Sequence, residues 1–261
     1  MSILDHFEET NNGSLILKLK PEERDPFLSR IPQEYRRCYI TDKKIEEVFL
    51  AHKEKVSSKE IIQSKIPDPG SVMAGEFGEI TAYFILKGKY LPLKLIGPKK
   101  WQWKIDRNKA LPFTDVIMFH RNKKPSNEDL LMSAEVKTKS TKHTKNPIQQ
   151  AVEGVQKDKI SRLARTLSWL KDKYTSVDPN PEKIEYLDRF INSQEDKYGK
   201  YTKHFKAVAV IDSSFLDNDL KEKIKVPDID GDFEIIIVSL DTLKEVYEDT
   251  YKVMLKTYES S

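Results

Sequence analysis

The stretch LLMSAEVKTK, residues 130–139, alternates between apolar and polar side chains. A period of two predicts a β-strand with Met132, Ala134 and Val136 on one face. The opposite face then carries the polar residues Ser133, Glu135, Lys137 and Lys139. The strand is apolar enough to lie inside a sheet, where charged side chains are uncommon unless they are paired or functional. The same spacing places Glu135 and Lys137 about 7 Å apart on one face.

A second strand is predicted from FTDVIMF, residues 113–119, with Asp115 at its beginning. A hairpin between the two strands can bring Asp115 beside Glu135. Before both strands, the apolar spacing of residues 72–87 predicts a helix that contains GEFGE, residues 75–79. Glycine costs about 1 kcal/mol inside a helix, so two glycines one turn apart indicate a close approach of this helix to the strands. Such an approach would bring Glu79 toward the strands, with Glu76 as the alternative carboxylate.

These side chains match the needs of phosphodiester hydrolysis. Hard divalent cations take carboxylate and carbonyl oxygens, so we expect Asp115, Glu135 and the Val136 carbonyl to hold Mg²⁺ or Mn²⁺. Glu79 would hold a water or a second ion. The Lys137 ammonium would orient the attacking water and favour its hydroxide form. Because the carboxylates repel each other, Asp115→Asn or Glu135→Gln is predicted to leave the metal-free fold at least as stable.

A structural alternative is that Glu135 and Lys137 form a buried ion pair with no catalytic role. The triplet Glu-x-Lys carries little weight alone, because it recurs at residues 195–197 in a polar helical stretch. The functional interpretation depends on the strand around Glu135, on Asp115 upstream of it and on the helix of Glu79 before both.

Two basic segments are candidates for nucleic-acid contacts. KTKSTKHTK, residues 137–145, has no acidic residue, and its Lys139, Lys142 and Lys145 are predicted to contact the phosphate backbone. PKKWQWK, residues 98–104, alternates lysines with tryptophans. We predict that Trp101 stacks on unpaired bases and that Lys104 contacts the backbone, with core packing of the tryptophans as the alternative.

Composition limits the class of protein. The chain has 261 residues, of which 33% are charged and 10% aromatic, which favours a folded domain with a heavily solvated surface. The net charge of +3 requires any nucleic-acid surface to be local. A single cysteine excludes an internal disulfide and a zinc site built on several thiolates, and it fits a reducing cytoplasm. No apolar run approaches the roughly 20 residues of a membrane span, and no export signal is expected.

The order of elements predicts an α/β fold with an N-terminal arm. Residues 1–69 would form the arm, with strands at 14–20 and 35–40 and a helix from Thr41 to about 53. The turn PDPG at 67–70 separates it from a main domain over 70–261. There we expect a mixed central sheet flanked by helices. Its predicted elements after the first helix are a meander of strands at 92–97, 113–120 and 130–139, helices from 146 to about 173 and on to about 199, strands at 205–211 and 233–240, and a final helix.

The segments GEITAYFIL (78–86), TDVI (114–117) and SAEVKTKST (133–141) resemble the PD-(D/E)XK nuclease superfamily. This resemblance covers about residues 71–175. It implies a restriction-endonuclease-like core, magnesium as the ion, metal ligation by Asp115 and Glu135, water activation by Lys137 and a helix carboxylate at Glu79. Thr114 stands where the superfamily has proline, a position on which no chemistry rests.

Within that superfamily the whole pattern is most similar to HamA, the nuclease subunit of Hachiman anti-phage systems. The similarity implies a cytoplasmic, metal-dependent DNA endonuclease that acts in antiviral defence. It also implies a helicase partner of the HamB type, and no ATPase motif is visible in this chain. Two alternatives are a stand-alone restriction-like or DNA-repair nuclease with the same site, and a non-catalytic DNA-binding module.

Overall fold

The computed structural model describes residues 2–11, 13–53, 55–142, 144–226, 228–229 and 231–258. Within these residues six strands form one sheet in the order β1-β2-β6-β5-β4-β3. The strands β2, β6, β5 and β4 run parallel, and β1 and β3 are antiparallel to their neighbours. Their bounds are β1 (Phe7–Asn11), β2 (Leu15–Leu19), β3 (Val116–His120), β4 (Leu130–Lys139), β5 (Thr202–Asp212) and β6 (Asp232–Leu240).

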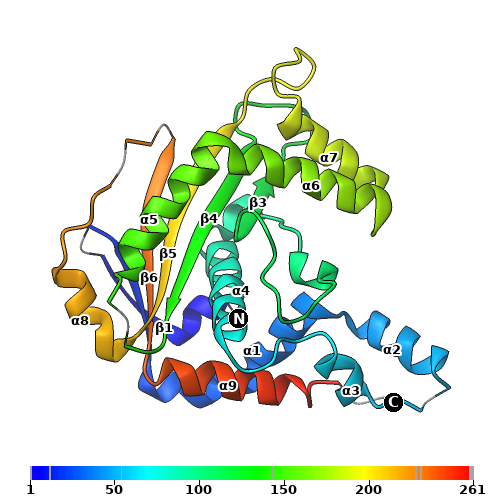
Figure 1. Cartoon of the computed structure of the whole chain (residues 1–261). Helices are drawn as coiled ribbons and strands as arrows, with labels where there is room; N and C mark the ends of the chain where they lie inside the picture. The colour runs from blue at the N-terminus through cyan, green and yellow to red at the C-terminus, as the bar shows by residue number, and fades with distance from the viewer. Residues whose placement is uncertain are drawn as a thin grey trace.

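Helices cover both faces of the sheet (Figure 1). One face packs on α1 (Arg24–Tyr39), α4 (Ser71–Lys89) and α9 (Leu243–Met254), with α2 (Asp42–Ala51) and α3 (Ser58–Gln63) beside them. The other face packs on α5 (Pro147–Lys157), α6 (Leu163–Ser176), α7 (Pro181–Ile191) and α8 (Ser213–Lys221). The predicted mixed sheet flanked by helices is therefore confirmed. No helix in the described ranges is both long and apolar enough to cross a bilayer.

Three local predictions are wrong. Residues 35–39 form the end of helix α1, and not a strand. Tyr35, Cys38 and Tyr39 recur at helical spacing, and all three are buried on one side of the helix. Residues 92–97 hold a short 3₁₀ turn and a single bridge between Ile96 and Phe119, so the predicted meander reduces to the β3–β4 hairpin. The helix expected to reach residue 199 ends at Ile191, the last residue of α7.

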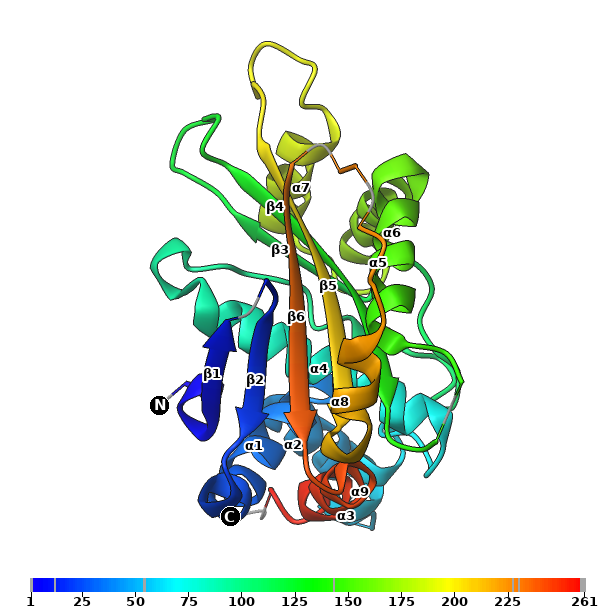
Figure 2. The same cartoon turned by 90° about the vertical axis from the view of Figure 1, so that its left-hand side faces the viewer.

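The N-terminal segment contributes to the same sheet as the rest of the chain (Figure 2). Strand β2 pairs in parallel with β6, with Leu15 opposite Ile236. The hydroxyls of Tyr35 on α1 and Thr81 on α4 also lie 2.7 Å apart in the core. The N-terminal segment is thus part of the sheet and of the core. The division into two domains at residue 69 stays a prediction.

The close approach of α4 to β4 depends on one of the two glycines. A Cβ atom at Gly78 would lie 2.1 Å from the Thr138 hydroxyl oxygen, whereas one at Gly75 would meet nothing within 4 Å. Gly78 therefore lets the helix rest against the strand. Gly75 instead faces the pocket described below.

We expect Gly78→Ala to lower the free energy of unfolding by about 1–3 kcal/mol, because α4 or Thr138 has to move. Gly75→Ala should be neutral or raise it by up to about 1 kcal/mol through helix propensity. Urea unfolding of the two variants checks this matched pair. Equal effects would show that the spacing of α4 and β4 does not depend on Gly78.

Candidate active site

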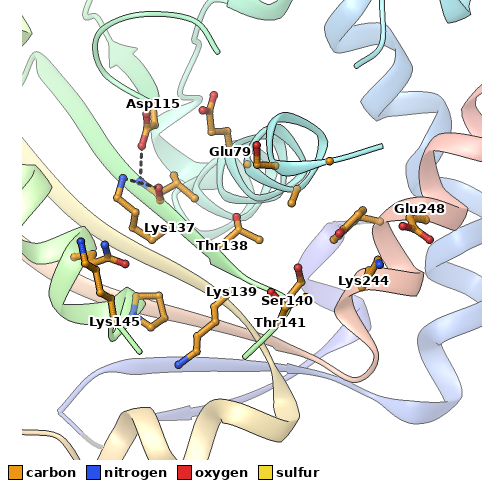
Figure 3. A pocket seen from close by; sticks show the side chains of 18 of the residues that line it. Glu79, Asp115, Lys137, Thr138, Lys139, Ser140, Thr141, Lys145, Lys244 and Glu248 are labelled. Atoms are coloured by element: carbon orange, nitrogen blue, oxygen red, sulfur yellow. Dashed lines mark hydrogen bonds between the residues drawn. The ribbon is translucent and has the colours of Figure 1, made fainter. Parts of the chain in front are cut away.

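A pocket of about 770 Å³ lies where the first half of α4, the end of β4 and α9 meet (Figure 3). Six of the predicted residues line it, namely Glu79, Asp115, Val136, Lys137, Lys139 and Lys145, whereas Glu135 is not among its lining residues. Its rim is built from the β4–α5 loop and from α9. The polar rim residues include Ser140, Thr141, Lys145, Lys244 and Glu248.

Asp115 lies at the point where the β3–β4 pairing ends. The last paired residues are Val116 and Ala134, and beyond them Asp115 Oδ2 accepts a 2.8 Å hydrogen bond from the Val136 N–H. The N–H and C=O of one strand residue point to the same edge, so the Val136 carbonyl faces this side too. The carboxylate and the carbonyl that were predicted as cation ligands are therefore neighbours on one strand edge.

The Asp115 carboxyl is buried among other carboxylates. Burial, followed by the negative charges of Glu79 and Glu135, raises its pKa from 3.8 to about 7. Its hydrogen bond comes from a neutral backbone group. A bound cation would lower this electrostatic cost, and hard oxygen donors are the ligands that Mg²⁺ and Mn²⁺ prefer. Asp115 and the Val136 carbonyl are therefore donors of the type that such an ion takes.

Asp115→Asn should stabilise the metal-free fold in a pH-dependent way. The raised pKa means that folding is penalised only when Asp115 is ionised, so the penalty is absent below about pH 4 and complete above about pH 7. The gain in unfolding free energy should grow across that window to at most about 4 kcal/mol. Urea unfolding at pH 4 and pH 8 in chelator checks it. A destabilised variant at both pH values would contradict the assignment.

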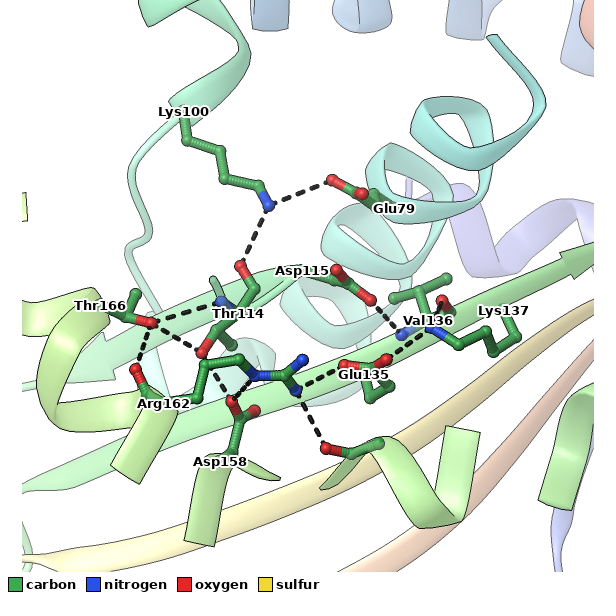
Figure 4. Close-up of polar contacts among 11 residues, drawn as sticks. Glu79, Lys100, Thr114, Asp115, Glu135, Val136, Lys137, Asp158, Arg162 and Thr166 are labelled. Carbon is green, nitrogen blue, oxygen red and sulfur yellow. Dashed lines mark hydrogen bonds and ion pairs between the residues drawn. The ribbon is translucent and has the colours of Figure 1, made fainter. Parts of the chain in front are cut away.

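Glu135 is held by two cations (Figure 4). Its Oε1 lies 2.5 Å from Lys137 Nζ, and its Oε2 lies 2.5 Å from Arg162 Nη2. Lys137 Nζ also donates to the Val136 carbonyl at 3.2 Å. The ion pair of the structural alternative is thus present, and in the described part of the chain no three His, Cys, Asp or Glu side chains form a group that could hold a metal. Metal binding by Asp115 and Glu135 stays a prediction.

These contacts revise the expected stability of one variant. Glu135→Gln would remove the counter-charge of both Lys137 and Arg162. Losing one partner of a buried pair costs about 3–5 kcal/mol, so this substitution should destabilise the fold, contrary to the prediction from the sequence.

Glu79, and not Glu76, is the helix carboxylate that lines the pocket. Its Oε2 accepts from Trp101 Nε1 at 3.1 Å and lies 3.2 Å from Lys100 Nζ. Burial raises its pKa despite the nearby Lys100. Glu76 points elsewhere, since it accepts from the Tyr39 hydroxyl at 2.9 Å and pairs with Lys104.

Three charged residues near the pocket were missed by the sequence analysis. Lys100 bridges Glu79 and the Thr114 carbonyl, which it reaches at 3.0 Å. Arg162 Nε pairs with Asp158 at 2.5 Å. The four-residue spacing of Asp158 and Arg162 in a helical pattern is typical of an ordinary surface pair, so only their tertiary position identifies them.

The structure places two of the predicted nucleic-acid contacts, Trp101 and Lys104, away from any DNA surface. Trp101 is 2% exposed and packs against Tyr83, so it belongs to the core instead of a base-stacking surface. Lys104 is buried beside Glu76, which removes it from a DNA contact. Lys139 lines the pocket and pairs with Asp219 at 2.7 Å, so its contact with DNA stays a prediction.

Two lysines of the β4–α5 loop remain candidates for DNA contacts. Lys142 and Lys145 are exposed, and Lys145 lies on the rim of the pocket. His143 of the same run lies outside the described residues. Contacts of Lys142 and Lys145 with DNA stay a prediction.

Comparison with protein families gives a match. A family model described as HamA matches residues 2–254, which include the N-terminal strands, the pocket and α9. No curated protein matches the chain. The similarity to HamA that the sequence segments indicated is therefore confirmed over nearly the whole chain.

Proposed function

The chain belongs to the HamA family of Hachiman-type defence proteins, and from this premise we propose that it is a metal-dependent DNA endonuclease of the PD-(D/E)XK type. One observation carries the proposal. Asp115 and the Val136 backbone meet on one strand edge, in the same pocket as Glu79 and Lys137. Ordinary packing does not require a buried carboxylate of raised pKa at that position.

The balance of charge supports one dication and one phosphate. Ion pairs and electrostatic contacts link three cations and four carboxylates at the site, which together carry one net negative charge when all are ionised. A divalent cation would make it singly positive, and one phosphodiester would neutralise it. The cluster is formed by the carboxylates Glu79, Asp115, Glu135 and Asp158 and the cations Lys100, Lys137 and Arg162.

The chain's own residues supply the remaining functions. Asp115, Glu135 and the Val136 carbonyl would hold Mg²⁺ or Mn²⁺, and the bound ion would polarise the scissile phosphate. Lys137 would orient the attacking water and stabilise its hydroxide form. Glu79, fixed by Trp101 and Lys100, would hold a further water on the helix side of the pocket.

A HamB-type helicase is the partner we propose, acting in the cytoplasm and holding the nuclease inactive until DNA is sensed. Co-expression with that helicase should suppress cleavage until an activating DNA is added. Sequence-specific cutting by the lone chain would favour a stand-alone restriction-like or repair nuclease instead.

Incubation of the purified chain with supercoiled plasmid tests the proposed activity. We expect nicking and degradation with Mg²⁺ or Mn²⁺, and intact plasmid when a chelator is present. DNA binding without cleavage in either metal, also after removal of the partner, would support the non-catalytic module.

A further inference from the structure

We propose that Arg162, anchored by Asp158, is a positioning residue that fixes the Glu135 carboxylate for cation binding. This inference rests on the proposed function, since it concerns the same site. Arg162 ends a helical turn between α5 and α6, which cover the face of the sheet opposite α4. From that face its guanidinium reaches Glu135 on β4 (Figure 4).

The guanidinium joins three acceptors from three different parts of the chain. Its Nη2 lies 2.5 Å from Glu135 Oε2 on β4 and 3.0 Å from the Gly154 carbonyl on α5. Its Nε lies 2.5 Å from Asp158 Oδ1. A planar fork with several fixed donors holds a carboxylate in one orientation, which the single ammonium of a lysine does not.

The backbone of α5 closes the space around the same carboxylate. A Cβ atom at Gly154 would lie 2.4 Å from the Cγ, Cδ and Oε1 atoms of Glu135. Glycine at this position therefore lets the helix pass directly over Glu135. With α5 on one side and Arg162 at Oε2, the carboxylate has little rotational freedom.

Asp158 connects this arrangement to the other predicted ligand. Its Oδ1 accepts a 2.8 Å hydrogen bond from the Thr114 hydroxyl, and Thr114 directly precedes Asp115. Asp158 and Arg162 are the first and last residues of a π-helical turn, a rare feature that often occurs at functional sites. The contacts thus run from the residue beside Asp115, through Asp158 and Arg162, to Glu135.

The consequence concerns the two oxygens of Glu135. Arg162 occupies Oε2, so that Oε1 is directed toward Lys137, which lines the pocket. A carboxylate oxygen has two lone pairs, so Oε1 can accept from Lys137 and still bind a cation. Arg162 would therefore present one oxygen of Glu135 in a fixed position beside Asp115.

A titration of the full-length chain with Mn²⁺, followed by the electron paramagnetic resonance of the free ion, tests this role without measuring cleavage. We expect Arg162→Gln and Arg162→Lys to weaken Mn²⁺ binding by about 10–100-fold. Arg165→Gln is the matched control, since Arg165 lies three residues later, is exposed and donates a 3.4 Å hydrogen bond to the Ser161 hydroxyl. It should bind Mn²⁺ like the unaltered chain.

Asp158→Asn provides a second variant that does not touch Glu135. It should weaken Mn²⁺ binding less than Arg162→Gln, and the double variant should be no weaker than Arg162→Gln alone. Circular dichroism establishes which variants are folded. If Arg162→Gln does not fold, the Mn²⁺ affinity of Asp158→Asn tests the positioning role.

Unchanged Mn²⁺ affinity in folded variants would overturn the positioning role. Tighter Mn²⁺ binding would also overturn it, because Arg162 would then compete with the cation for the Glu135 carboxylate. If the unaltered chain binds no Mn²⁺ and cuts no DNA, the proposed function fails. If it binds and cuts while the Arg162 variants match it, only this inference fails.

Discussion

Replacing Asp115 by asparagine is expected to lower the rate of plasmid cleavage by about 10³-fold or more while the chain stays folded. Asparagine keeps the shape and still accepts the hydrogen bond from the Val136 N–H, which Asp115 accepts at 2.8 Å. It removes the negative charge that we propose attracts the cation. Loss of cleavage in a variant that is not less stable would separate the catalytic role of Asp115 from a structural one.

Cleavage assays should compare Asp115→Asn with the unaltered chain at saturating Mg²⁺ and Mn²⁺, with urea unfolding on the same samples. Glu135→Gln is a less useful probe, because it also disrupts the pairs with Lys137 and Arg162. Near-normal cleavage by Asp115→Asn would remove Asp115 from the site.

Lys137→Ala is expected to slow cleavage by about 10²–10⁴-fold and to reduce DNA affinity only slightly. The ammonium lies 2.5 Å from Glu135 Oε1 and 3.2 Å from the Val136 carbonyl, so it is placed beside the two oxygens that we propose bind the ion. Its loss would leave the attacking water without its orienting charge.

Lys142→Ala is the matched control for Lys137→Ala. Lys142 is exposed in the loop after β4, so its loss should weaken DNA binding and leave the single-turnover cleavage rate of bound DNA nearly unchanged. Single-turnover cleavage and filter binding measure the two effects. The role of Lys137 is wrong if both variants lose affinity and rate in the same proportion.

Local periodicity was sufficient to predict the strands that carry the site. The alternation around Glu135 predicted β4, and the predicted hairpin of β3 and β4 is present. Asp115 was expected beside Glu135, and its carboxylate accepts from the N–H of the next residue, Val136, at 2.8 Å. The end of α1 was not predicted, since residues 35–40 were assigned to a strand. The helix also contains Pro32, a residue that is unfavourable inside helices.

The partners of the charged residues could not be predicted from local sequence. The segment of Trp101 and Lys104 mixes aromatic and basic residues. This pattern is typical of a DNA-binding surface, and also of a segment that packs on acidic residues. Glu79 and Glu76 on α4 decide between the two, because they bind Trp101 and Lys104 in the core. Arg162 likewise reaches Glu135 only through the packing of α5 on β4.

The most direct test of the central claim is anomalous X-ray diffraction from crystals of the chain grown with Mn²⁺. The account predicts one strong peak within about 2.0–2.6 Å of an Asp115 carboxylate oxygen and the Val136 carbonyl oxygen, with Glu135 Oε1 as a further ligand. A Mn²⁺ peak away from these atoms, in protein that degrades plasmid, would contradict it.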